Sequence, residues 1–226
     1  MTATIISGQI TSKTGKYKMF MVIGPTLLAL GYFYLTSFNA DTQYWQASIG
    51  MILIGLGLGQ LMQTLTLAAQ NSVPASEVGV ATASATFFRQ MGGTLGVAIF
   101  ISILFNNLAD TIPAAFKRAD VQAGLKAALK DPKVLSDPNN AEFLKGLQSG
   151  NMGALAGKLN TDSSFLNNLD PRLARPFLVG FADAGVTVFT IAGAVVAVAI
   201  VIAIFTKAPA LRTKSAVQEA AAAAAH

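Results

Sequence analysis

The chain has 226 residues, of which 53% are hydrophobic and 12% are charged. Soluble domains carry about 25% charged residues, so this composition and the positive mean hydropathy indicate a membrane protein. The chain lacks cysteine and its single histidine is His226, which excludes disulfide frameworks, thiolate metal sites and histidine-based catalysis. The net charge of +5 comes from basic residues dispersed beside acidic ones, which argues against nucleic-acid binding.

Residues 1–18 are predicted to form a cytoplasmic loop. Lys13, Lys16 and Lys18 precede the first apolar run, but only after a polar, glycine-bearing stretch that has no cleavable apolar region before it. This pattern is not that of a secretory signal.

Four long blocks of the chain contain no charged residue and no histidine: 19–40, 42–76, 90–109 and 184–206. A helix needs about 20 apolar residues to cross a hydrocarbon core of about 30 Å. Charge-free length and turn residues together predict spanning helices at 19–38, 47–70, 80–106 and 178–206. The expected fold is therefore an all-α membrane protein, since a spanning helix satisfies its own backbone hydrogen bonds.

The second and third spans each carry a stripe of polar side chains. Gln60, Gln63 and Thr64 share one face of the second span, because they stand three and four residues apart. Thr82, Thr86, Arg89, Gln90 and Gly93 form a similar stripe on the third. Polar groups need partners where water is scarce, so the candidate cavity or gate residues are Gln60, Gln63, Thr86, Arg89 and Gln90.

Arg89 raises the sharpest question, because a charge at the centre of a membrane helix costs about 2.5 to 3.5 kcal/mol on insertion scales. One interpretation is an arginine that extends its head group to the cytoplasmic surface. The other is a buried charge paired with an acid or with helix-end carbonyls at a gate.

Glycines cluster in the same two spans. "GLGLG", residues 55–59, lies inside a charge-free span and lacks the preceding strand of a phosphate-binding loop. We expect close helix packing instead, at Gly55, Gly57, Gly59, Gly92, Gly93 and Gly96.

Residues 107–177 hold nine basic and seven acidic residues and are predicted to form a long helical extracytoplasmic loop. Within it, 113–132 reads as one amphipathic helix. The loop either caps the membrane helices or binds a partner. The last span, 178–206, is followed by a cytoplasmic tail over 207–226.

Basic residues flank the first and last spans, and four spans return the chain to one side of the membrane. By the positive-inside rule, both termini are expected in the cytoplasm. The predicted location is the cell (inner) membrane, crossed several times.

Three segments resemble the fourteen-helix drug:proton antiporters of the major facilitator superfamily. "SGQITSKTGKYKMF" is similar to the cytoplasmic loop of pattern G-x-L-x-D-R-x-G-R, with Gly8, Lys13, Gly15 and Lys16 in register and Ser12 at the acidic position. "VPASEVGVATASATFFRQMGGTLGVAIF" resembles the entry to the penultimate helix of these transporters, and "LARPFLVGFADA" their last helix.

The resemblance implies that the chain is the final third or so of such a transporter, with residues 1–8 ending the helix before its four spans. It implies a proton-coupled exporter of amphipathic compounds, with lipid, protons and the remaining helices of the bundle as partners and without a metal or cofactor. Arg89 would brace or gate the cytoplasmic end of the cavity, with its counter-ion elsewhere in the bundle. The isolated chain is expected to be inactive.

Two other classes of function compete with this one. A small four-span interaction or scaffold protein would use the extracytoplasmic loop as its binding domain. An enzyme embedded in the membrane is not supported, because no paired carboxylates, metal cluster or activated nucleophile occur.

Overall fold

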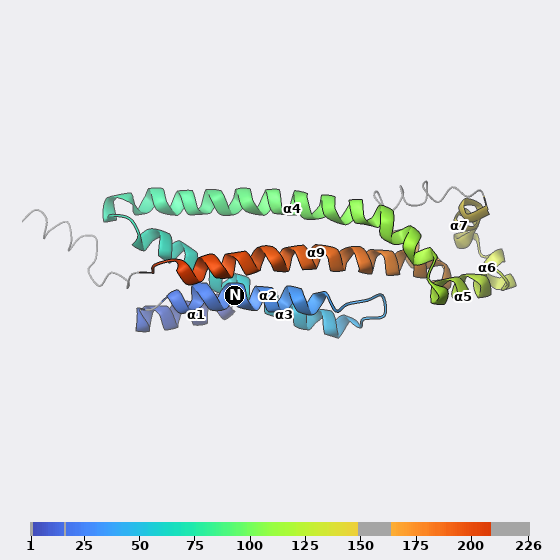
Figure 1. The fold of residues 1–226 in the computed structure, drawn as a ribbon, viewed down its shortest axis with the longest axis horizontal. Coiled ribbons are helices and arrows are strands. Elements are labelled where there is room, and N and C mark those ends of the chain that lie inside the picture. Colours follow the sequence, from blue (N-terminus) through green and yellow to red (C-terminus); the bar gives the residue numbers. More distant parts are fainter. Residues whose placement is uncertain (1, 16, 149–163, 209–226) are drawn as a thin grey trace, which may run out of the picture. The chain divides into compact units, whose positions relative to one another are not determined.

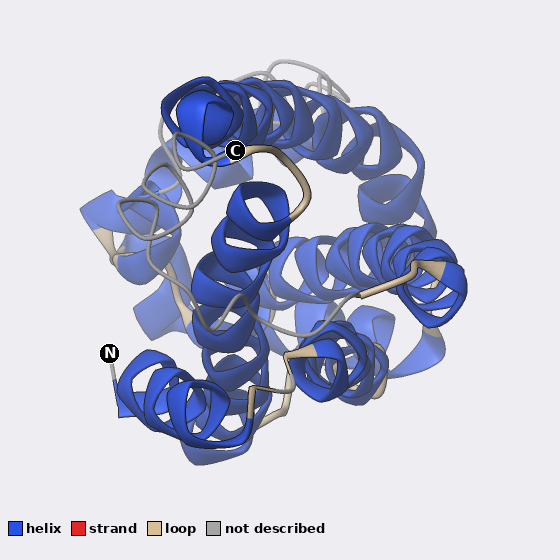
Figure 2. Ribbon diagram, turned by 90° about the vertical axis from the view of Figure 1, so that its left-hand side faces the viewer, coloured by secondary structure: helices blue, strands red, loops and turns tan. Residues whose placement is uncertain are grey.

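A computed structural model describes residues 2–15, 17–148 and 164–208, and this part of the chain is helical without a strand (Figures 1 and 2). Four helices are long and apolar enough to cross a membrane, which confirms the predicted all-α membrane fold. They are α2 (Lys18–Leu35), α3 (Tyr44–Asn71), α4 (Val78–Phe116, preceded by a 3-10 turn at Ala75–Glu77) and α9 (Pro171–Phe205). The shorter elements are α1 (Thr2–Thr14), α5 (Ala119–Ala128), α6 (Pro132–Ser136), α7 (Pro138–Gln148) and a 3-10 turn at Ser164–Asn167.

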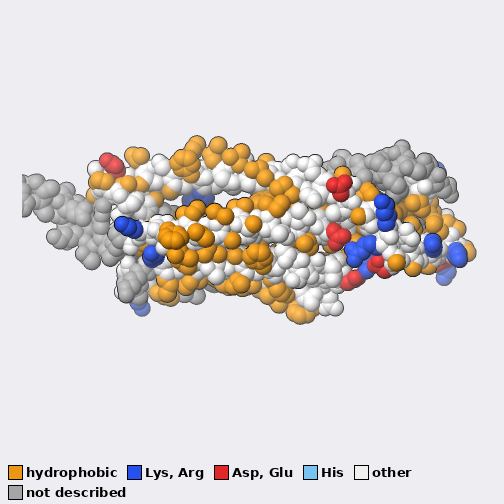
Figure 3. Space-filling model, viewed as in Figure 1, with side chains coloured by type: hydrophobic (Ala, Val, Ile, Leu, Met, Phe, Trp, Pro, Cys, Tyr) orange, Lys and Arg blue, Asp and Glu red, His pale blue; other side chains and the backbone are white. Residues whose placement is uncertain are grey.

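The chain divides into two compact units. Unit 1 consists of residues 1–36, 43–99 and 189–226, and unit 2 of residues 37–42 and 100–188. Helices α4 and α9 contribute to both. In Figure 3, hydrophobic side chains cover the long helices, whereas acidic and basic side chains gather around the short helices of unit 2.

Helices α2 and α3 form a hairpin in unit 1 that is built on two pairs of glycines. A Cβ added to Gly57 would lie 2.6 Å from the carbonyl oxygen of Gly24. One heptad away, a Cβ added to Gly31 would lie 3.2 Å from the carbonyl oxygen of Gly50. Only hydrogen fits at these crossings, and the two backbones therefore approach closely, as is usual where small residues meet in membrane helices.

Particular residues set the end of α1 and the start of α3. Gly15 closes α1 with a φ of +66°, a left-handed conformation that glycine adopts without strain. Gln43 and Gln46 form a capping box at the start of α3. Tyr44 and Trp45 follow in the first turn with largely exposed rings, as expected for aromatic residues at a membrane interface.

The third and fourth long helices extend well beyond the predicted spans. Helix α4 continues through Pro113 to Phe116, and α9 already begins at Pro171. The prediction of a single amphipathic helix over 113–132 is therefore wrong. Its first residues belong to α4, and a turn at Lys117 and Arg118 interrupts the helical structure before α5. Proline lacks an N–H and bends a helix without necessarily ending it, and α4 bends in its last turns (Figure 1).

Unit 2 has an apolar core of its own. The end of α4, the start of α9 and helices α5 to α7 meet around Phe177 and Phe143, whose rings stack edge to face at 5.8 Å. Asn140 is buried in this unit, donates to the Val134 carbonyl at 3.0 Å and accepts from the Asp170 N–H at 3.0 Å. Both ends of its amide are thus used to join α6, α7 and the start of α9, which makes the described part of the expected loop a packed helical unit.

Candidate functional site

The polar stripe of α3 faces α1. Thr4 Oγ1 donates to the Gly59 carbonyl at 3.0 Å, and a Cβ on Gly8 would lie 2.7 Å from the Gln63 amide nitrogen. Ser7 and Thr11, on the same face of α1, are each 2% exposed. Gln63 therefore lies against a helix with small and polar side chains, within the segment that was expected to be a loop.

Gln60 carries an unsatisfied acceptor. Its side-chain oxygen Oε1 is buried and has no hydrogen-bond partner among the described residues. One turn along, the buried hydroxyl of Thr64 donates to the Gln60 carbonyl at 2.7 Å. A buried acceptor without a partner is costly, and it is suited to accept a hydrogen bond from water or from a bound molecule.

Two further contacts extend the polar face toward the end of α3. Asn71 Nδ2 donates to the hydroxyl of Tyr17 at 3.5 Å, and Gln70 Nε2 donates to Thr82 Oγ1 at 3.0 Å. The second contact joins the end of α3 to the predicted polar stripe of α4 near the turn between these helices.

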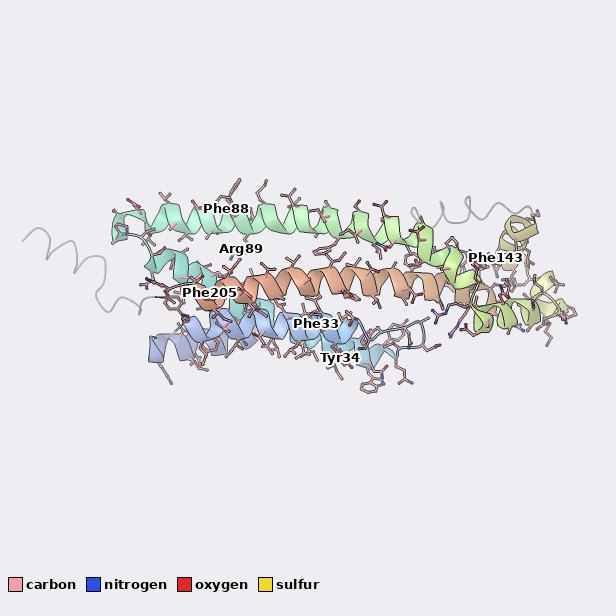
Figure 4. The ribbon with its side chains drawn as sticks, viewed as in Figure 1. Phe33, Tyr34, Phe88, Arg89, Phe143 and Phe205 are labelled. Atoms are coloured by element: carbon pink, nitrogen blue, oxygen red, sulfur yellow. The ribbon has the colours of Figure 1, made fainter. Side chains whose placement is uncertain are left out.

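Arg89 lies farther along α4, where residues 87–95 are exposed on every side within this chain. Phe88 and Arg89 project to opposite sides of the helix (Figure 4). Arg89 Nη2 donates to Thr86 Oγ1 at 3.4 Å. Among the described residues, no carboxylate forms a salt bridge with Arg89.

The six glycines predicted to pack helices occupy different environments. Gly57 touches α2, and the carbonyl of Gly59 accepts a hydrogen bond from α1. The other four have open space where a Cβ would stand: Gly55, Gly92, Gly93 and Gly96.

The residues of the predicted cytoplasmic loop motif lie partly within a helix and partly at its end. Gly8 and Lys13 lie within helix α1, and Gly15 stands at its end. Lys16 lies outside the described residues. Gly8 contacts Gln63, whereas Lys13 is exposed.

Ion pairs in unit 2 form a second polar cluster that sequence reasoning missed. Arg175 donates from both terminal guanidinium nitrogens to the carboxylate of Asp41 in the α2–α3 loop, one of them at 2.7 Å. Arg172 bonds Asp170 and Asp131 at 3.0 Å each, and Arg118 lies 3.3 Å from Asp183. Hydrogen bonds from these arginines hold the pKa of Asp41, Asp131 and Asp170 below its ordinary value. No sequence signal pairs residues 134 positions apart, as Arg175 and Asp41 are.

The glycine pairs of α2 and α3 were missed as well, although a signal for them existed. Gly24 and Gly31 are seven residues apart in one span, and Gly50 and Gly57 are seven apart in the next. A heptad repeat of small residues in two adjacent spans predicts a close antiparallel crossing.

In the described part of the chain, no group of three acidic or histidine side chains could hold a metal ion.

The four apolar helices and the polar residues within them define a multi-pass membrane protein. The chain is 29% identical over 199 residues to a tetracycline resistance determinant of Streptomyces rimosus, covering 86% of this chain and 54% of that protein. It is 35% identical over 150 residues to the multidrug transporter protein MdtP of Bacillus subtilis, covering 65% of this chain and 27% of that protein. A tetracenomycin C resistance and export protein of Streptomyces glaucescens is 27% identical over 205 residues, which are 89% of this chain and 34% of that protein.

Other relatives are described as MFS-type transporters. The resemblance is thereby confirmed, and the chain is similar to part of the drug-efflux and drug-resistance transporters of the major facilitator superfamily. It spans about half of the length of the first of these relatives and about a quarter of the second. No family model matches the chain, and no solved structure matches it significantly.

Proposed function

We propose that this chain forms part of a proton-coupled exporter of amphipathic compounds that works by alternating access. The main support for the proposal is the alignment with a tetracycline resistance determinant, which covers 86% of the chain at 29% identity. In such transporters two halves of a helix bundle rock about a site near the middle of the membrane. The chain supplies several helices of one half, and the remaining helices of the bundle supply the rest, including most of the proton-coupling carboxylates.

Gln60 and Gln63 line the transport pathway in this proposal. Two observations support that role: Gln60 Oε1 has no hydrogen-bond partner in the described part of the chain, and Gln63 contacts α1. An amide can accept from a donor group of a substrate and donate to an acceptor, so these side chains suit amphipathic compounds of varied chemistry.

Arg89, with its neighbours Thr86 and Gln90, acts as a gate at the cytoplasmic end of the pathway. Arg89 is eleven residues into α4, about 16 Å along a helix that rises 1.5 Å per residue. A permanent charge at such a depth needs a partner. Since no described carboxylate binds Arg89, its counter-charge belongs to the remaining helices.

The chain lies in the cell (inner) membrane with both termini in the cytoplasm. Lys13 and Lys18 before the first long span, and Lys207 after the last, support this orientation by the positive-inside rule. Unit 2 then faces the extracytoplasmic side.

A segment exchange tests the transport role. The part of the Streptomyces rimosus determinant that matches this chain is replaced by residues 1–226, and tetracycline resistance is measured in a pump-deficient strain. We expect resistance from the chimera and none from the isolated chain. Arg89→Ala and Gln63→Leu should each lower the resistance of the chimera by at least about tenfold. A tenfold change corresponds to the loss of one polar interaction of about 1.4 kcal/mol.

The matched control is Phe88→Leu, which changes the opposite side of α4 from Arg89. Resistance that survives both polar substitutions would reject the proposed pathway. Full resistance from the isolated chain would reject the need for further helices.

The packed core of unit 2 favours one alternative, a four-span interaction or scaffold protein with an extracytoplasmic binding domain. The same chimera separates the two. In the alternative, Gln63→Leu and Arg89→Ala leave function intact, whereas deletion of residues 113–168 abolishes it.

A further inference from the structure

An apolar pocket of about 420 Å³ lies between α2, α3 and α9 in unit 1. Met21, Pro25 and Leu28 of α2 form one wall, and Leu61 and Leu65 of α3 form a second. Four residues of α9 between Val196 and Ala203, together with Thr206 just after the helix, form the third. Its volume falls within the range of small-molecule sites, about 300 to 1,000 Å³.

The lining selects for a hydrocarbon. Thr206 is the one lining residue with a polar side chain, and its hydroxyl donates to the Ile202 carbonyl in the last turn of α9 at 2.7 Å. A ligand that fills the pocket therefore meets methyl and methylene groups along its length, and it finds a free acceptor only at the Thr206 end.

The packing of α2 against α9 places two lysines at that same end. The helices run in opposite directions (Figure 1), and a Cβ on Gly193 would lie 3.5 Å from the Phe33 ring and 3.6 Å from Tyr32 Cβ. Lys207 follows Gly193 by fourteen residues and lies two residues past the end of α9, and Lys18, the first residue of α2, precedes Tyr32 by fourteen residues. Because the two helices rise equally per residue, the start of α2 at Lys18 and the end of α9 just before Lys207 lie at about the same level.

Both lysines are exposed, and neither forms a salt bridge with a described residue. Lys18 stands one turn before Met21 and thus shares the helix face that lines the pocket. Among the described residues of unit 1 the basic side chains are Lys13, Lys18, Arg89 and Lys207, and Glu77 is the sole acidic one. The mouth of the apolar pocket is accordingly positive.

We propose that this pocket binds one acyl chain of an anionic phospholipid, whose phosphate is held by Lys18 and Lys207. Basic residues next to the ends of membrane helices attract anionic lipids, and lysine extends its ammonium group to the interface while its stem covers apolar surface. The site goes beyond the transport proposal and does not depend on it.

Lipid retention by the purified 226-residue chain tests the site. The chain is extracted from vesicles of equal parts phosphatidylglycerol and phosphatidylcholine, and bound lipids are counted by native mass spectrometry. We expect one phosphatidylglycerol per chain, with each lysine contributing about fivefold to the preference over phosphatidylcholine. The double variant Lys18→Gln and Lys207→Gln should lose the preference, and the control Lys13→Gln, an exposed lysine of α1, should keep it.

Substitutions that fill the pocket distinguish lipid binding at this site from a general attraction of anionic lipids to the basic residues. Ala199→Phe and Leu65→Trp introduce bulk at partly or largely exposed wall positions from two different helices, so helix content measured by circular dichroism should stay unchanged. Each should remove the retained lipid. Equal retention of phosphatidylcholine, an equal effect of Lys13→Gln, or retention by both filled variants would overturn the proposal.

Discussion

Individual polar residues in this protein differ in the neighbours that they find within the chain. Gln63 and Thr64 find neighbours inside the chain, on α1 and within α3. Arg89 finds only the hydroxyl of Thr86 among the described residues. In unit 2, by contrast, arginines and aspartates satisfy each other, as Arg175 and Asp41 do. Among the described residues, each of these groups thus has a close neighbour, and that of Arg89 is an uncharged hydroxyl.

The Asp41–Arg175 pair predicts a pH dependence of stability. Its arginine lowers the pKa of Asp41 in the folded state, so the pair stabilises unit 2 above the ordinary aspartate pKa of about 3.9. That stabilisation is lost as the pH falls through the lower folded-state value. We expect Asp41→Asn to reduce the thermal stability of the chain at pH 7 and to make less difference as the pH falls below the ordinary aspartate pKa.

Thermal unfolding of both proteins between pH 7 and 2.5 measures this difference. Arg172 also lowers the pKa of Asp131 and Asp170, and both groups are present in both proteins. Only the difference in stability between the two proteins therefore reports on Asp41. Asp110→Asn is the control, because Asp110 is exposed and forms no salt bridge among the described residues. An effect of Asp41→Asn that is the same at every pH would contradict the assignment.

At the level of elements, the α2–α3 hairpin is the best-defined packing unit of the membrane part. Gly24 opposes Gly57, and Gly31 opposes Gly50, one heptad apart. In contrast, the glycines of α4 meet open space. Among the described residues of unit 1, close helix packing at glycines is therefore found where α1, α2 and α3 meet, and not in the middle of α4.

Gly57→Ala tests the hairpin. Alanine normally stabilises a helix relative to glycine by about 0.5 to 1 kcal/mol, but here its Cβ would lie 2.6 Å from the Gly24 carbonyl oxygen. Overpacking of this kind costs about 1 to 3 kcal/mol. We therefore expect Gly57→Ala to lower the free energy of unfolding measured by denaturation in mixed micelles.

Gly55→Ala is the matched control, since Gly55 lies two residues away in the same helix with open space around it. This variant should be neutral or slightly more stable. Equal stability of the two variants would show that α2 and α3 do not cross at Gly57.

For the whole molecule, the proposed orientation places both termini in the cytoplasm and the segment 107–177 on the extracytoplasmic side. Because the natural chain lacks cysteine, single cysteines at Lys13, Lys126 and Lys207 provide clean reporters, and all three positions are exposed. We expect a membrane-impermeant maleimide to label Lys126→Cys in intact spheroplasts. Lys13→Cys and Lys207→Cys should react only after permeabilisation. Labelling of all three in intact spheroplasts would contradict the proposed topology.

The sequence predicted the number and approximate place of the spans, because charge-free length is a local property that the bilayer alone demands. It did not predict how far α4 and α9 extend beyond the apolar core, since Pro113 and Pro176 stand inside continuous helices rather than at their ends. It placed Gln60, Gln63 and Arg89 on helix faces, but periodicity cannot identify the helix that each face meets.

The apolar blocks, the polar stripes and the similarity to drug exporters were therefore determined by the sequence by itself, through composition and spacing along one dimension. Only the tertiary structure decided that Gln63 lies against Gly8, that Gly24 meets Gly57 and that Arg175 binds Asp41. These contacts join residues far apart in the chain, and they depend on how helices cross in three dimensions.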